Sequence, residues 1–344
     1  PILYQLAFAE VEQSTVRGGS HLVGRARATQ LGSYSPDRHR ITRHPWVPAP
    51  GAAVRTLPRG TDPYESIAPD GWFLLGTVIA TAVPVYLDLE ATCQGHLAIL
   101  GMTRMGKTTL ALHLARSLAA RSRVTILDQT GEYVAKRGLD AYMQDHDDLP
   151  TGISVFEPAA GRIAADEAYN FLSRLVRKAA EEYRAGQPRP RVLIIDEAHQ
   201  FIPEPAGLGF NAPGRDSAYK FGVLMMQVRK FGIAIILISQ RTAVVGKSAL
   251  SQCENVIAFK SVDQTGLDYL EAVLGESARL LLPSLTQGQA LVFGPATSTE
   301  APVAVQVCRH GDLLVGAGVP AGGVLEQPVV ARHVAEAIPG PGLD

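Results

Sequence analysis

The stretch 98–115, AILGMTRMGKTTLALHLA, joins a short apolar run to a helix through a glycine-rich turn. The turn reads G-x-x-x-x-G-K-T. In that pattern the backbone N–H groups wrap phosphates, the lysine reaches the β- and γ-phosphate oxygens, and the hydroxyl binds Mg²⁺. The apolar run in front and the leucine-faced helix behind provide the strand and helix that the pattern requires. The sequence therefore predicts a phosphate-binding loop, with ATP and Mg²⁺ as its ligands.

The middle of this loop carries a long cation, Arg104, and a large thioether, Met105, where small residues are usual. Because the backbone N–H groups make the cradle, we expect nucleotide binding to survive both side chains. Arg104 either reaches a γ-phosphate or a neighbouring molecule, or it slows turnover. The predicted nucleotide-binding set is Gly101, Met102, Thr103, Arg104, Met105, Gly106, Lys107, Thr108 and Thr109.

A second half of the site is expected where a buried strand ends in acids. The segment 191–201, RVLIIDEAHQF, places Asp196 and Glu197 after four apolar residues. Asp196 is predicted to hold Mg²⁺, together with Thr108, and Glu197 to orient or deprotonate the attacking water. The alternative is a strand end that simply enters solvent. For His199, two residues further on, packing and catalysis both remain open.

Polar residues flank another apolar run in the segment 229–241, RKFGIAIILISQR. Gln240 ends the run, where an amide could sense the γ-phosphate or the water. Arg229 and Lys230 precede the run and so lie at the opposite edge of the sheet, useless to their own nucleotide but well placed for a neighbour's. A solvated helix end is the alternative for both. Arg241 is a further candidate finger or sensor.

The segment 127–133, LDQTGEY, completes the set of candidate site segments. Asp128 ends the second predicted strand. Glu132 could support the attacking water or touch a neighbouring subunit, and a surface role is the alternative.

The chain divides into three parts by pattern. Up to residue 92, short β-type runs alternate with Gly/Pro turns, which predicts a small β-barrel or sandwich. From 93 to 310 strands alternate with helices, including a helix over 166–184, and the continuous apolar runs 192–196 and 233–239 indicate parallel strands buried on both faces. Residues 311–344 are Gly/Pro-rich and predict an extended arm. The fold class is α/β with a small β-domain in front.

Composition limits the function classes. The 344 residues are 46% hydrophobic and 19% charged with a formal net charge of −1, so the chain can bury a core, and any nucleic-acid contact must come from a local patch. Three widely spaced cysteines argue against a disulfide or zinc framework. The uncharged run 71–87 contains Pro84 and β-branched residues, which favours strands over a membrane span. A cytoplasmic protein is expected, with an initiator methionine or more preceding Pro1.

The letters D-E-A-H (196–199) also occur in helicases with two tandem ATPase lobes, in which the second lobe supplies an arginine. Too few residues follow Arg241 for such a lobe. We therefore expect the arginine to come from another copy of the chain, most simply in a ring.

Six segments in order resemble the HerA branch of the HerA/FtsK superfamily, over residues 22–308. They are VPVYLDLEATCQGHLAILGMTRMGKTT (83–109), ILDQTGEY (126–133), VLIIDEAHQF (192–201), RKFGIAIILISQR (229–241), SALSQCENVIAFK (248–260) and LPSLTQGQALVFG (282–294). The resemblance implies an N-terminal HAS-type barrel, a RecA-like core, a hexamer around duplex DNA and ATP-driven translocation. It also implies a partner protein. The partner is either a nuclease that resects DNA ends in recombination or, in antiviral operons, a nuclease or an NAD-consuming effector.

Two departures from the family pattern stand out. Positions 104 and 105 are usually glycine and serine. The connection between TGEY and the strand at 191 is short, which indicates a compact, defence-type motor. The leading hypothesis is a hexameric DNA translocase or helicase that works with a nuclease or effector in DNA end processing or antiviral defence. The alternative is an ATP-gated scaffold ring that moves nothing, which the near-zero net charge favours.

Expected contacts with DNA and with a partner complete the hypothesis. Cations after two of the motifs are candidates for the pore, namely Lys136, Arg137, Arg215 and Lys220. No nuclease centre is expected in the chain itself, because the acids before residue 92 are scattered among turns and strand ends. Partner contacts are instead expected on the barrel, where Trp46, Tyr64 and Trp72 are surface candidates, with core packing as their alternative.

Overall fold

The computed structural model describes residues 1–16, 19–45, 49, 52–53 and 55–308. The expected arm at 311–344 and Trp46 therefore lie outside the described residues. The centre is a ten-stranded sheet in the order β5-β4-β13-β12-β11-β6-β10-β9-β7-β8. Its strands are β4 (Trp72–Val78), β5 (Pro84–Asp88), β6 (Leu97–Leu100), β7 (Arg123–Leu127), β8 (Gly152–Phe156), β9 (Arg191–Ile195), β10 (Ile233–Ser239), β11 (Asn255–Phe259), β12 (Gln289–Phe293) and β13 (Val303–Val307).

The strands from β11 to β8 run parallel to their neighbours, whereas β12, β13, β4 and β5 are antiparallel. All seven residues of β10 are buried, as expected for an apolar run covered on both faces. The predicted α/β fold with a mainly parallel sheet is confirmed.

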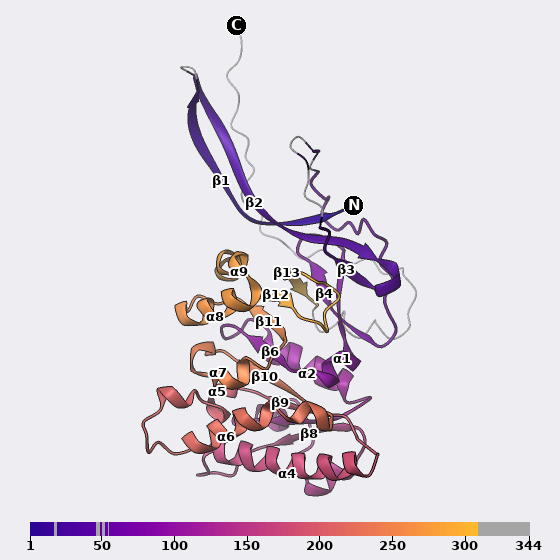
Figure 1. Cartoon of the computed structure of the whole chain (residues 1–344), viewed down its shortest axis with the longest axis vertical. Coiled ribbons are helices and arrows are strands. Elements are labelled where there is room, and N and C mark those ends of the chain that lie inside the picture. The colour runs from indigo at the N-terminus through magenta and orange to yellow at the C-terminus, as the bar shows by residue number, and fades with distance from the viewer. Residues whose placement is uncertain (17–18, 46–48, 50–51, 54, 309–344) are drawn as a thin grey trace.

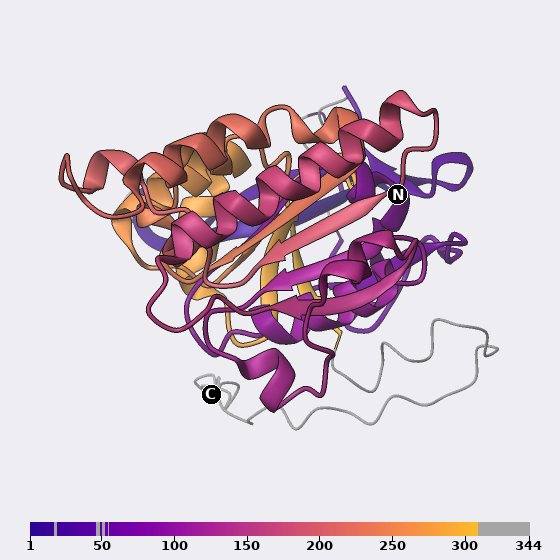
Figure 2. The ribbon, with the colours of Figure 1, turned by 90° about the horizontal axis from the view of Figure 1, so that it is seen from below.

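Side chains alternate between two cores, one on each face of the sheet. Leu97 and Ile99 of β6 face a core that contains helix α2, while Ala98 and Leu100 face the core under α4 and α6. Figure 2 shows α4 and α6 running side by side over one face. The helices are α1 (Leu89–Gln94), α2 (Lys107–Leu118), α3 (Glu132–Ala135), α4 (Ala164–Arg184), α5 (Ala198–Phe201), α6 (Arg215–Met225), α7 (Lys247–Leu250), α8 (Gln264–Leu274) and α9 (Glu276–Leu281).

Short 3₁₀ turns connect several of these elements. They are η1 (Pro36–Arg38), η2 (Gln144–Asp148), η3 (Pro205–Gly207), η4 (Val228–Phe231), η5 (Thr242–Val244) and η6 (Leu282–Ser284). Of these, η4 matters most for the site, because it leads from α6 directly into β10.

The N-terminal part is a separate antiparallel sheet of β1 (Leu3–Val16), β2 (Gly19–Ser35) and β3 (Arg40–Thr42). The β1–β2 hairpin extends away from the main body (Figure 1). Its base is tied to α9, since Arg27 pairs with Glu276 at 2.9 Å and the hydroxyls of Thr29 and Ser277 lie 2.9 Å apart. This sheet is compatible with a small N-terminal β-domain.

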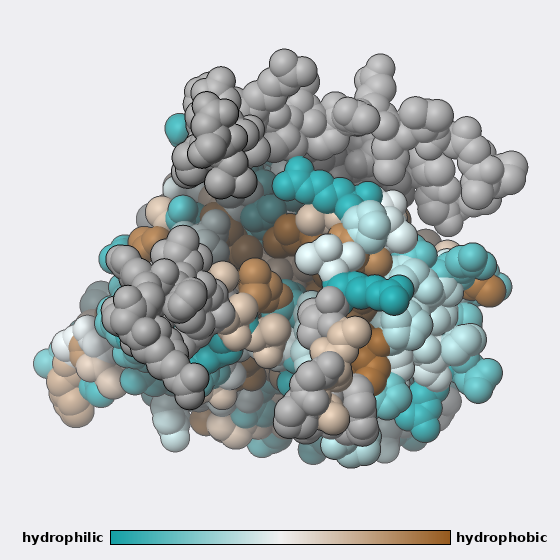
Figure 3. Space-filling model, turned by 90° about the horizontal axis from the view of Figure 1, so that it is seen from above, coloured by the Kyte–Doolittle hydropathy of each residue, from teal (hydrophilic) through white to brown (hydrophobic). Residues whose placement is uncertain are grey.

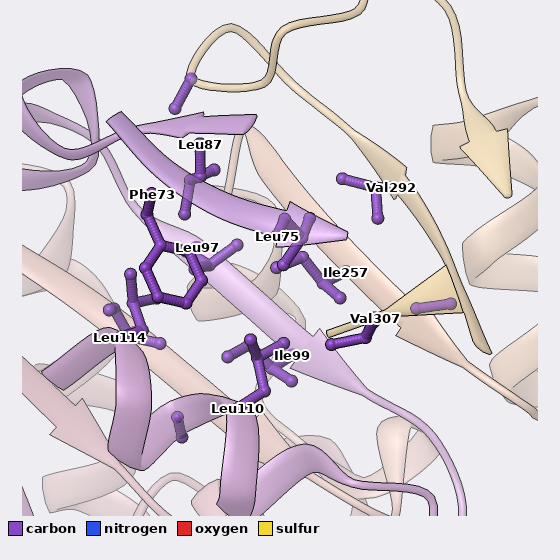
Figure 4. Close-up of a cluster of buried hydrophobic side chains, with 14 of the residues drawn as sticks. Phe73, Leu75, Leu87, Leu97, Ile99, Leu110, Leu114, Ile257, Val292 and Val307 are labelled. Carbon is purple, nitrogen blue, oxygen red and sulfur yellow. The ribbon is translucent and has the colours of Figure 1, made fainter. Parts of the chain in front are cut away.

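The expected domain boundary at residue 92 is wrong, because β4 and β5 belong to the main sheet through the β4–β13 pairing. Phe73 and Leu75 of β4 and Leu87 of β5 pack in the same core as β6 and α2 (Figure 4). Not every β-type run before residue 92 forms a strand, since the described residues of 52–58 (AAVRTLP) contain none. Those residues before β4 that the structure describes contain three strands and no closed barrel.

Two of the candidate partner-contact aromatics make contacts within the chain, as their core-packing alternative predicts. The Tyr64 hydroxyl donates to the carbonyl oxygens of Pro1 and Gly32, both at 3.1 Å, and its ring lies against Tyr34. Trp72 lies in β4 beneath the guanidinium of Arg40. Both side chains are half-buried. None of the helices in the described part of the chain has the length and apolar character needed to cross a membrane.

Candidate nucleotide-binding site

The predicted phosphate loop connects β6 to α2, as expected. Gly101 has φ 133° and Gly106 has φ 110°, conformations that favour glycine. A Cβ at Gly101 would also lie 2.7 Å from the Cβ of Phe259 in β11. Arg104 adopts φ 60° although it has a side chain. This left-handed conformation explains why glycine suits position 104 and implies strain of about 1 kcal/mol.

Met105 and Lys107 lie at the base of the loop. The Met105 side chain packs in the core and also lines the cavity beside the loop. Lys107 is 8% exposed, and its ammonium donates to the carbonyl oxygen of Met102 at 2.7 Å. Burial lowers the pKa of Lys107, while the nearby Glu197 and Asp196 carboxylates oppose that shift. The lysine is therefore close enough to both predicted acids to be influenced by their charge, and phosphate oxygens can replace the Met102 carbonyl.

Asp196 follows β9 at the carboxyl edge of the sheet. Its Oδ2 accepts a hydrogen bond from the Tyr133 hydroxyl at 2.9 Å, and its Oδ1 accepts from the Glu197 N–H at 2.9 Å. Burial raises the pKa of Asp196, and these two hydrogen bonds counteract the shift. One fixed carboxylate and the Thr108 hydroxyl form a hard-oxygen set that suits Mg²⁺ held mainly by phosphates and water.

Tyr133 is a site residue that sequence reasoning missed. It lies in α3 and is fully buried, and burial raises the pKa of its phenol, which stays a neutral donor to Asp196. Asp128 fixes this arrangement, because its carboxylate accepts from the N–H of Tyr133 at 3.0 Å and from the N–H and hydroxyl of Thr130 at 2.8 and 2.7 Å. The DQTGEY segment therefore positions the predicted magnesium ligand. The signal was the tyrosine five residues after a strand-ending aspartate.

Glu197 adopts a left-handed backbone conformation, with φ 50° and ψ 49°. Its Oε2 lies 3.3 Å from Nδ1 of His199, and His199, followed by Lys107, lowers the pKa of the Glu197 carboxyl despite its partial burial. The contact of this buried Oε2 with His199 is within ion-pair distance but lacks the geometry of a hydrogen bond among the described residues. A carboxylate kept ionised by the neighbouring His199 fits the predicted base.

His199 lies between Glu197 and β10. Its Nδ1 is 3.4 Å from the hydroxyl of Ser239, the last residue of β10, and that hydroxyl accepts the N–H of Arg241 at 3.0 Å. The Gly101 N–H donates to the Ser239 carbonyl at 3.2 Å, which places the next residue, Gln240, beside the loop. The Gln240 side chain is half-buried, whereas the Arg241 side chain is exposed. His199 therefore contacts the predicted base and does not merely fill the core.

Arg229 and Lys230 lie in η4, at the amino end of β10, whereas the phosphate loop follows the carboxyl end of the parallel strand β6. The Arg229 guanidinium forms a fork with Glu254, with N–O distances of 3.0 and 3.2 Å. The Lys230 ammonium lies 4.9 Å from the ring centre of Phe231. As expected, neither cation is placed at its own chain's phosphate loop.

Several predicted DNA-contacting cations have intrachain partners. Arg215 donates to the carbonyl oxygens of Pro205 and Phe210 at 3.1 and 3.3 Å. Lys220 pairs with Asp216 at 2.5 Å, and Arg137 pairs at 3.3 Å with Glu132, the other candidate of the DQTGEY segment. Lys136 is exposed.

A cavity of about 450 Å³ adjoins the loop on the α2 side. It is lined by Gly106 and Thr109 of the predicted loop, by Phe259, and by Gly288 and Gln306 from β12–β13 and the turn before them. Its position beside the start of α2 is where the remainder of a nucleotide would continue from the phosphates.

Residues 73–200 match the family described as "Helicase HerA, central domain". This segment begins in β4 and contains the phosphate loop, Tyr133 and the Asp196–Glu197 pair. The central part of the chain is therefore similar to the central domain of HerA helicases. The chain is 32% identical over 120 residues to the probable DNA double-strand break repair helicase HerA of Methanocaldococcus jannaschii, covering 34% of this chain and 22% of that protein.

Other proteins show similar partial matches. The DNA double-strand break repair helicase HerA of Saccharolobus solfataricus is 28% identical over 146 residues, 40% of this chain and 27% of that protein. The chain therefore spans about a quarter of the length of these relatives. The structure of VirB4 from Thermoanaerobacter pseudethanolicus superposes with a TM-score of 0.52 at 13% identity, covering 72% of this chain and 99% of that one. This likeness concerns the fold alone.

Proposed function

We propose that the chain is the ATP-hydrolysing subunit of a motor that moves duplex DNA. The observation that carries this proposal is the convergence of Lys107, Asp196 and Glu197 on one phosphate loop in a HerA-type domain. ATP would place its phosphates along 101–109, and its ribose and base in the adjoining cavity. Mg²⁺, held by Thr108 and Asp196, would neutralise phosphate charge.

The protein groups then divide the chemistry. Lys107 leaves the Met102 carbonyl and binds the β- and γ-phosphate oxygens. Glu197 accepts a proton from the attacking water, and His199, which contacts Oε2, keeps that carboxyl ionised and oriented. Gln240, at the end of β10, is placed to contact the water or the γ-phosphate.

A ring, most simply a hexamer, would complete each site with Arg229 or Arg241 of a neighbouring subunit. The position of Arg229 at the amino edge of the sheet supports this arrangement, because its own nucleotide lies at the carboxyl edge. The helix that leads to Arg229 also exposes an apolar stripe of Tyr219, Val223 and Met226, which are 61%, 38% and 53% exposed. Their spacing puts them on one face of α6 and its last turn, which suits a contact between subunits.

DNA would be contacted by the loop between α5 and α6. Phe210 is 88% exposed, and the guanidinium of Arg215 lies 5.4 Å from its ring centre while holding the loop backbone. An exposed aromatic ring backed by an arginine suits nucleic-acid sugars and bases. In this proposal Arg215 shapes the loop and Phe210 makes the contact.

A partner nuclease or effector would dock on the N-terminal sheet, in DNA end processing or antiviral defence. Tyr4 and Leu6 of β1 are 40% and 56% exposed, and Ile67 is 67% exposed. Seen from the side of the hairpin, the molecule shows apolar side chains in a hollow with polar ones around it (Figure 3). In a ring, several copies of a weak contact would add up to a strong one.

The second candidate is an ATP-gated scaffold ring that moves nothing. The net charge of −1 and the intrachain pairing of Arg137 and Lys220 favour it. The two functions are separated by measuring ATPase rates with and without duplex DNA, followed by displacement of a protein roadblock, with Lys107→Ala as the inactive control. DNA stimulation with displacement supports the motor, and an ATPase indifferent to DNA supports the scaffold.

A further inference from the structure

The Arg229 guanidinium, at the amino edge of the sheet, has a hydrogen-bond acceptor for each of its three nitrogens. Its Nη1 donates to Oε2 of Glu254 at 3.2 Å and its Nη2 to Oε1 at 3.0 Å, while its Nε donates to the carbonyl oxygen of Gln94 at 3.2 Å. The Arg229 and Glu254 side chains are 46% and 34% exposed, so the pair is accessible from outside.

This arrangement uses both faces through which a guanidinium can bind an oxyanion with two parallel hydrogen bonds. The end-on face, made by the two Nη atoms, is occupied by Glu254. The side-on face requires Nε, which is engaged by Gln94. A phosphate prefers the same two-bond geometry. Arg229 therefore cannot grip a phosphate in this way until it leaves Glu254.

The surroundings keep Glu254 in place. A Cβ at Gly95 would lie 2.4 Å from the Glu254 Oε1, so glycine leaves the space that the carboxylate occupies. The next residue, Asn255, is 2% exposed and donates to the His96 carbonyl from both its N–H and its Nδ2, each at 3.2 Å. Because the backbone at Glu254 is fixed, the mobile partner is the Arg229 side chain.

We propose that Glu254 is a latch that restrains Arg229 in a subunit without a loaded neighbour, and that Arg229 exchanges Glu254 for the phosphates of a nucleotide bound by the adjacent copy. This inference rests on the proposed trans role of Arg229. The exchange replaces one carboxylate with a more highly charged triphosphate in a drier interface, where charge-assisted bonds are stronger. Arg229 would thus leave Glu254 only when the adjacent subunit has bound a nucleotide. This makes Glu254 a positioning residue for hydrolysis.

The test is Glu254→Gln in the full chain, which keeps the side-chain shape and removes the charge. We expect the subunit concentration that gives half-maximal ATPase activity to fall about fivefold, the change that corresponds to removing a competing pair worth about 1 kcal/mol. Glu254→Asp, whose carboxylate is too short for the fork, should give a smaller fall. Glu271→Gln is the matched control, because it removes a carboxylate that pairs with Arg279 at 2.7 Å and is 32% exposed.

The same assay in an Arg229→Ala background separates the possible failures. We expect Arg229→Ala to abolish most turnover and Glu254→Gln to change nothing further in that background. Wild-type turnover in Arg229→Ala would overturn the trans role itself. If Arg229→Ala is inactive but both Glu254 variants match or fall below the wild type, with unchanged circular dichroism, the latch is overturned and Glu254 is a structural partner.

Discussion

His96 gives a sharp prediction, because its fully buried imidazole contacts the two elements on either side of η4, α6 and β10. Its Nδ1 accepts the N–H of Ile235 in β10 at 3.0 Å, and its Nε2 lies 3.3 Å from the carbonyl oxygen of Met225 at the end of α6. The first bond requires an unprotonated Nδ1 and the second an Nε2–H, so the folded state needs the neutral ring. Burial lowers the pKa of His96 to about 4.

The sign follows from proton binding. Between the unfolded pKa of about 6.5 and the folded pKa of about 4, His96 is protonated in the unfolded chain but not in the folded chain. The free energy of unfolding therefore falls as the pH falls. From pH 7.5 to pH 5 the loss through this residue amounts to about 2 kcal/mol. At pH 7.5 the unfolded imidazole is also largely neutral, and the contribution is close to zero.

The measurement is urea unfolding of the wild type and of His96→Gln at both pH values. Other titrating groups contribute equally to the two proteins, so the difference between their pH-dependent losses isolates His96. We expect the wild type to lose about 2 kcal/mol more than His96→Gln over this range. Equal losses would refute the reasoning, because they would mean that His96 binds its proton equally well in the folded and unfolded chains.

Four further outcomes follow from the site. Glu197→Gln should bind ATP as the wild type does but hydrolyse it about 10²–10⁴ times more slowly, as single-turnover assays will show; comparable turnover would remove Glu197 as the base. Tyr133→Phe should raise the Mg²⁺ concentration for half-maximal ATPase about 10–100-fold by freeing Asp196, and an unchanged magnesium titration would contradict this role. Arg104→Gly should leave ATP affinity unaltered and raise turnover per site; identical turnover would make Arg104 a tolerated surface residue. Phe210→Ser should reduce DNA stimulation of the ATPase severalfold while the DNA-free rate stays constant, and full stimulation would exclude Phe210 from the DNA contact.

Local pattern was enough to predict the parts of the fold that are buried on both faces. The run 233–239 coincides with β10, and the phosphate loop lies between β6 and α2, because continuous apolar runs and glycine turns are set by neighbours in sequence. The strands β4 and β5 were predicted as strands but assigned to the wrong sheet. Strand pairing is nonlocal, and the alternation of Phe73 and Leu75 suits any half-buried sheet.

The residues of the candidate site likewise fall into those that a local motif predicts and those that it does not. Lys107, Asp196 and Glu197 were predictable because phosphate chemistry fixes their spacing from strand ends. The contributions of Tyr133, His96 and Glu254 depend on contacts made far along the chain, and none has a local motif. Met105 was assigned to the nucleotide from its place in the loop, and its inward-turned side chain packs in the core while lining the adjoining cavity.

The geometry of β10 connects these observations. Its carboxyl end presents Ser239 to His199, and through it to the predicted base, while its amino end follows η4 and Arg229. Seven buried residues at about 3.3 Å each separate the two ends by about 20 Å. In the proposed ring, the carboxyl end of this strand lies near the subunit's own nucleotide, and its amino end lies near the nucleotide of the neighbouring subunit. A fully buried strand is close-packed on both faces, and such an interior transmits strain. In the proposed ring, β10 and the residues next to it that His96 contacts would thus be the direct structural connection between a subunit's own site and its Arg229–Glu254 pair.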